Sequence, residues 1–178
     1  MGWKNVKQHY RIGHLVHLTT AGLCIGSQFI PEAIIVGAHG EILKRYDRAD
    51  AELARYQAEI DADAATFVRL MSEPDCFDRS VPVYSFRGSQ IIEKQCEDLG
   101  WPHVTHDGEL MYENGSFPTR DDAIRAAKAD ARSGITGWSS ALERARQEVA
   151  RVEQEINRAT ADLALLDTQF PDVVAEAD

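Results

Sequence analysis

Histidine and acidic side chains gather in one short stretch of the sequence, His103-Val104-Thr105-His106-Asp107-Gly108-Glu109. Imidazole and carboxylate groups are ligands that zinc accepts, and a further glutamate can act as general base towards a metal-bound water. These residue types raise the hypothesis of a metal-dependent hydrolase or transferase that uses His106, Asp107 and Glu109. In that hypothesis His103 and His106 are the candidate metal ligands.

The spacing of the same stretch also has an explanation without chemistry. Positions 103 and 106 point to opposite faces of a strand, so the two histidines share a metal only if a turn separates them. Asp107-Gly108 is a strong hairpin-turn signal, which accounts for both residues structurally. The sequence contains no Walker A loop, dinucleotide-binding glycine pattern or nucleophile elbow. We therefore expect no cofactor and favour a protein that is not an enzyme.

The composition is that of a folded protein, with 44% hydrophobic and 27% charged residues among 178. No apolar run exceeds the four residues found at 33–36, which is far too short to span a bilayer, and the N-terminus lacks the apolar segment of a secretion signal. The three cysteines, Cys24, Cys76 and Cys96, are odd in number and far apart, which favours reduced thiols. These features predict a cytoplasmic protein with one modest domain and a helical extension.

The formal net charge is −10. Affinity for nucleic acid comes mostly from Lys and Arg, so this acidic balance argues against nucleic acid as a partner. A basic N-terminus nevertheless leaves one alternative open, a nucleic-acid accessory protein. Its candidate contacts are Lys4, Lys7 and Arg11, which lie beside Trp3 and Tyr10 in the sequence.

The elements that must position these residues follow an α+β order. Residues 1–46 are typical of a small antiparallel β meander, because short apolar runs alternate with Gly and Pro. Residues 47–73 predict one helix, with Asp47 as its N-cap and Pro74 as its stop. Residues 81–134 predict a β-α-β-β-α unit. Its parts are a strand over 81–87, a helix over 89–99, two short strands around Asp107-Gly108, and a helix from Thr119 to Gly134.

The C-terminal segment 139–170 carries the sharpest pattern. Its apolar residues alternate spacings of three and four, as at the a and d positions of a coiled coil, and Ser140 with Glu143 forms a capping box. The stripe that we expect to meet another helix consists of Leu142, Val149, Val152, Ile156, Leu163, Leu166 and Phe170, with Ala145 and Ala159 between them. The acidic residues 171–178 predict a disordered tail.

Charges beside the stripe restrict how this helix can pair. A parallel homodimer would oppose Glu148 to Glu153 and Asp162 to Asp167, which disfavours that arrangement. An antiparallel pairing avoids these contacts, and its partner is either the chain's own 47–73 helix or the helix of a second subunit. The remaining interpretation is that the stripe is simply core.

Two parts of the sequence carry a resemblance: Trp3-Lys4-Asn5-Val6-Lys7-Gln8-His9-Tyr10-Arg11-Ile12-Gly13-His14, and residues 92–97, 100–108 and 111–114. They resemble small proteins encoded by tailed bacteriophages, a family without a known activity. The resemblance implies a phage product in the cytoplasm of a bacterial host. Small acidic phage proteins often modulate host machinery, including restriction and CRISPR systems, and some present carboxylates where a nuclease expects phosphates.

The leading hypothesis is therefore an interaction protein without enzymatic activity. We expect a homodimer with antiparallel helix pairing that binds a host or phage protein, such as a component of a bacterial defence system.

Overall fold

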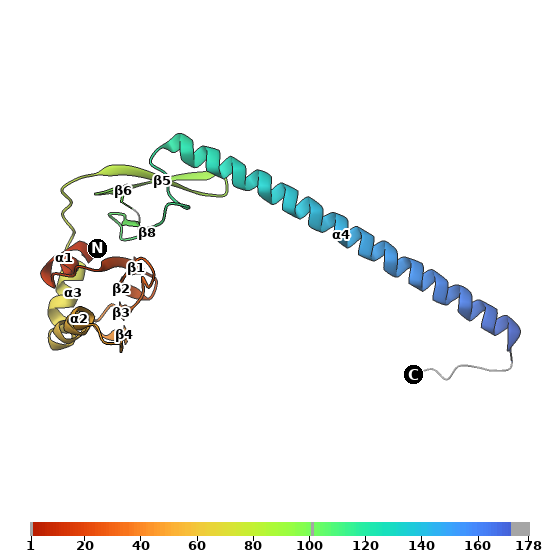
Figure 1. The fold of residues 1–178 in the computed structure, drawn as a ribbon, viewed down its shortest axis with the longest axis horizontal. Coiled ribbons are helices and arrows are strands. Elements are labelled where there is room, and N and C mark those ends of the chain that lie inside the picture. Colours follow the sequence, from red (N-terminus) through yellow and green to blue (C-terminus); the bar gives the residue numbers. More distant parts are fainter. Residues whose placement is uncertain (1, 101, 172–178) are drawn as a thin grey trace. The chain divides into compact units, whose positions relative to one another are not determined.

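The computed structural model describes residues 2–100 and 102–171 and has an α+β fold (Figure 1). The chain divides into two units, Met1–Ala127 and Lys128–Asp178. In chain order its elements are α1 (Trp3–His9), β1 (Leu15–Thr19), β2 (Gly22–Gly26), β3 (Ile34–Val36), β4 (Ile42–Lys44), α2 (Ala51–Ala62), α3 (Ala64–Ser72), β5 (Val81–Arg87), β6 (Gln90–Cys96), β7 (His103–Val104), β8 (Leu110–Met111) and α4 (Arg120–Gln169). The acidic tail expected over 171–178 lies, from residue 172 on, outside the described residues.

Strands β1–β4 form a four-stranded antiparallel sheet in sequential order, which is a meander. The pairing sets Val16 opposite Ile25 and Leu23 opposite Val36. All four side chains are buried in the core of the first unit. Apolar side chains in register across neighbouring strands thus give this sheet one buried face.

The chain begins with helix α1, whereas the sequence predicted a β meander from its first residue. Three large residues at helical spacing are buried in the core: Trp3, Val6 and Tyr10. The helix ends in a Schellman motif, in which Ile12 N–H donates to the Lys7 carbonyl at 2.9 Å and Arg11 N–H donates to the Gln8 carbonyl at 3.2 Å. Arg11 has a φ of 49°, the left-handed conformation that glycine usually supplies there.

Residues 47–73 form two helices rather than one. The N-cap is Asp50 instead of Asp47, because the Asp50 carboxylate accepts two backbone N–H groups of the first turn of α2. Asp63 separates the helices and caps α3 by accepting Thr66 N–H at 3.0 Å. One face of the pair joins the core through Leu53, Tyr56, Ile60, Phe67 and Leu70. The apolar face of α2 and α3 is therefore already covered within the first unit.

The helix predicted over 89–99 is wrong, because this segment is strand β6, paired antiparallel with β5. Gly88 and Ser89 form the two-residue turn between them, and Gly88 has the positive φ (58°) that such tight hairpins need. Cross-strand pairing with β5 thus decides the structure of a segment whose own pattern suggested a helix. The unit is a β5–β6 hairpin followed by the short β7–β8 hairpin and a helix, not β-α-β-β-α.

Helix α4 is continuous over 50 residues, or about 75 Å at 1.5 Å per residue. It begins as predicted, with Asp122 N–H donating to the Thr119 hydroxyl at 3.2 Å. The predicted break between 134 and 139 is wrong, and Ser140 is no cap, because its hydroxyl bonds a carbonyl one turn earlier within the helix. Gly134 and Gly137 each cost about 1 kcal/mol of helix propensity, which is too little to end so long a helix.

Candidate interaction surface

The candidate catalytic stretch, residues 103–109, forms a tight hairpin that is held by contacts within the protein. His106 stacks its imidazole on Phe77, with ring centroids 3.7 Å apart and planes 3° from parallel. Its Nε2 atom lies 3.1 Å from the carbonyl oxygen of Arg79. His103 is buried on β7, where its Nδ1 atom lies 3.1 Å from the carbonyl oxygen of Gly100. The two histidines therefore engage different parts of the first unit.

The two carboxylates that follow His106 pair with a lysine of β6. Lys94 Nζ lies 2.5 Å from Asp107 Oδ2 and also pairs with Glu109. Burial acts to raise the pKa of Asp107, but hydrogen bonds from Lys94 and Thr105 outweigh this effect and lower the pKa. Over residues 2–100 and 102–171, no three His, Cys, Asp or Glu side chains gather as a metal site would require. The arrangement is that of an internal ion pair that fixes the β7–β8 turn.

In the basic N-terminal cluster Lys4 is buried, Lys7 is partly buried and Arg11 is exposed. Lys4 is 8% exposed and donates to Glu97 at 2.7 Å. Burial lowers the pKa of Lys7. Trp3 is buried as well, and its indole N–H donates to the carbonyl oxygen of His106 at 3.1 Å. Trp3 and Lys4 are therefore engaged within the protein, whereas Arg11 remains on the surface.

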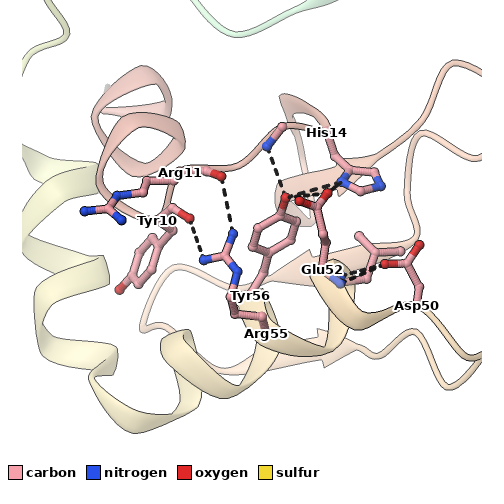
Figure 2. A network of polar contacts seen from close by, with 9 residues as sticks. Tyr10, Arg11, His14, Asp50, Glu52, Arg55 and Tyr56 are labelled. Carbon is pink, nitrogen blue, oxygen red and sulfur yellow. Dashed lines mark hydrogen bonds and ion pairs between the residues drawn. The ribbon is translucent and has the colours of Figure 1, made fainter.

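A polar network links α2 to the loop that follows α1 (Figure 2). The hydroxyl of the fully buried Tyr56 lies 3.4 Å from Glu52 Oε2 and 3.4 Å from His14 Nδ1. The same hydroxyl accepts the backbone N–H of Gly13 at 3.1 Å. Tyrosine, histidine and glutamate are residue types that transfer protons in enzymes. Here they fix the path of the chain between α1 and β1.

Arg55, one residue before Tyr56 on α2, makes further contacts with the same part of the chain. Its guanidinium donates to the carbonyl oxygens of Tyr10 and Arg11 at 3.1 and 3.4 Å (Figure 2). It also pairs with Glu59 at 3.0 Å. Carbonyl groups at the end of α1 are thus satisfied by a side chain far along the sequence. No local pattern indicates such a contact, because about 44 residues separate its partners.

The apolar stripe of α4 consists of exposed side chains. All seven residues predicted to meet another helix are exposed, with exposed fractions from 44% for Val152 to 58% for Ile156. The stripe is longer than predicted. Ile135 and Trp138 lie one heptad before Leu142 and Ala145, and their side chains are 68% and 79% exposed. The sequence-based prediction missed these two residues because it ended the preceding helix at Gly134.

The stripe lies along a single helix and is a candidate interaction surface. Exposed apolar residues that recur at a and d positions over several heptads are typical of coiled-coil helices. Among the helices that the structure describes, none is long and apolar enough to cross a bilayer. In comparisons with protein-family models, curated proteins and solved structures, nothing matches this chain.

Proposed function

We propose that this protein is a non-enzymatic interaction protein that binds its partner through the apolar stripe of α4. The observation that carries the proposal is the exposure of large apolar residues at successive heptad positions from Ile135 to Phe170. Contiguous exposed apolar surface is rare on monomeric proteins and commonly marks interaction sites. The complementary surface is another helix with its own apolar stripe, because knobs-into-holes packing joins such faces.

For the setting of this interaction we propose what the resemblance to small phage proteins implies. The protein would act in the cytoplasm of a bacterial host, where the complex would modulate a host or phage protein. A component of a defence system is the target we favour. Support for that target is the net charge of −10, since clustered carboxylates can compete with nucleic-acid phosphates for a basic surface.

The proposal is tested with aspartates placed on two faces of the same helix. The stripe variant carries Val149→Asp and Ile156→Asp, and the control carries Gln147→Asp and Gln154→Asp. The exposed glutamines lie on the face opposite the stripe, two residues before each stripe position. Both variants add the same charge, and far-UV circular dichroism reports whether α4 remains helical.

Binding is read by light scattering of the purified chain and by affinity capture from bacterial lysate. We expect the stripe variant to lose self-association or a captured protein that the control retains. If both variants associate as the unmodified chain does, the stripe is not the binding surface and the proposal fails.

A further inference from the structure

We propose that the occupant of the α4 stripe is the α4 helix of a second copy of this chain, packed antiparallel, with the twofold axis crossing the stripe at the level of residue 147. This inference rests on the proposed function and names its partner. The chain's own helices α2 and α3 are poor candidates, because their apolar face is buried in the core of the first unit. A separate helix must therefore supply the opposing stripe.

The charges at the e positions favour an antiparallel second copy. Counting heptads from Leu142, the e positions carry Arg125, Arg132 and Arg146 in the first part of α4 and Glu153 and Asp167 in the second. In an antiparallel pair, the e positions of the two helices run beside each other in opposite order. The basic part of each helix then lies along the acidic part of the other, at both ends of the twofold axis.

The g positions agree with this orientation. In the second part of α4 they carry Glu148, Glu155 and Asp162, whereas the first part has only small neutral residues at 127, 134 and 141. Antiparallel packing sets most of these acids beside small neutral residues. Parallel packing would set them against the acidic e positions at 153 and 167 instead, and like charges in such positions destabilise a coiled coil.

The sizes of the stripe residues define the register. With the axis at the level of residue 147, each a position meets the d position of the second copy for which the two residue numbers add to 294. Leu163 then meets Ala131 of the second copy, and Ile135 meets Ala159. Large residues then face small ones in these layers, as interdigitated packing prefers. A shift of one heptad either sets Phe170 beyond the start of α4 or sets Glu153 opposite its own copy. Only the register at residue 147 avoids both.

Two like-charge contacts remain, since Arg146 and Glu148 each lie one residue from the level of the twofold axis and so approach their own copies. Arg151 offsets the Glu148 contact within each helix, because its guanidinium binds both carboxylate oxygens of Glu148, at 2.7 and 3.1 Å. This bidentate pair spreads the charge where the two glutamates approach.

Cross-linking of the full-length chain distinguishes the orientations. Cys76 is the exposed cysteine among Cys24, Cys76 and Cys96, so all variants carry Cys76→Ser. One chain then carries Ile135→Cys and another carries Ala159→Cys, with tags of different mass, and a short bis-maleimide joins neighbouring thiols. Positions 135 and 159 are about 36 Å apart along one helix, which is beyond the reach of that reagent.

We expect a covalent dimer only when the two chains are mixed. Cross-linking of either chain with itself would show parallel packing and overturn the inference, as would the absence of any product. A chain that stays monomeric at all concentrations, yet captures another protein through the stripe, would refute this inference and leave the proposed function standing.

A charge swap tests the register independently. The proposed pairing sets Arg146 near Glu153 of the second copy, once on each side of the twofold axis. Arg146→Glu or Glu153→Arg alone makes both of these contacts repulsive, whereas the double variant restores opposite charges. We expect each single variant to raise the dissociation constant about tenfold, and the double variant to return it to near its original value. Equal dissociation constants for all four proteins at low salt would contradict the pairing of these residues.

Discussion

Replacing Gly134 and Gly137 with alanine should stabilise α4. Both glycines lie inside the helix, and a methyl group at either position has no heavy atom within 4 Å outside the helix's own backbone. Alanine is favoured over glycine in a helix by about 1 kcal/mol per site, so the double variant gains about 2 kcal/mol. A change of that size shifts the equilibrium between closed and open helix by roughly 30-fold.

The assay is amide hydrogen exchange of peptides from residues 128–150, measured by mass spectrometry. Exchange in the double variant should slow by up to that factor, because local opening of the helix becomes less frequent. Peptides from β1–β4 should exchange as in the unmodified protein, since the substitutions contact nothing in that sheet.

Gly88→Ala is the matched control, because a methyl group there also has no neighbour within 4 Å. The difference is its φ of 58°, where a side chain costs about 1–2 kcal/mol. This variant should therefore lower the thermal midpoint of the first unit. If Gly88→Ala is neutral, or if the double variant in α4 exchanges no more slowly, backbone conformation does not govern these positions and the reasoning is refuted.

Three further predictions concern the first unit. Glu97→Gln should cost about 2 kcal/mol at neutral pH, because it removes the charge that pairs with the buried Lys4. Since the pKa of Glu97 is lowered in the folded protein, the pair stabilises the fold above the ordinary pKa of 4.5 and loses that effect as the pH falls. Urea unfolding of the variant should therefore depend less on pH, between about 5 and 3, than urea unfolding of the unmodified protein. Arg11→Gly should raise the free energy of unfolding by about 1 kcal/mol by relieving the left-handed backbone, and a lower urea midpoint would contradict this. Tyr56→Phe should cost about 1 kcal/mol, with faster amide exchange at Gly13, whose N–H loses its acceptor.

Local patterns predicted the parts of the fold that depend on neighbours in sequence. The strands of the meander and the first turn of α4 follow from alternating apolar residues and from the Thr119 cap. The heptad pattern predicted the apolar stripe that includes Leu142, but it left open whether the stripe is core or meets another helix, and in the structure the stripe is exposed. The Gly88-Ser89 turn was available as a hairpin signal, and missing it produced the wrong helix over 89–99.

The candidate chemical site could not be resolved in the same way. His106 and Asp107 have the residue types of a metal site, but their contacts are Phe77 and Lys94, from segments well before them in the chain. Likewise, Trp3 reads as part of an exposed basic end, although tertiary packing buries it. The type of a residue shows which chemistry its side chain is capable of. Whether that side chain is already bound within the fold depends on partners that are distant in sequence.

The contacts of α1 also constrain the order in which the chain can fold during synthesis. Gly2 N–H donates to the carbonyl of Met71, and the Trp3 indole donates to that of His106, 103 residues later. A ribosome delivers the N-terminus first, so the apolar face of α1 stays uncovered until α3 emerges and packs against it. Chains truncated before α3 would keep that face exposed and should be prone to aggregate.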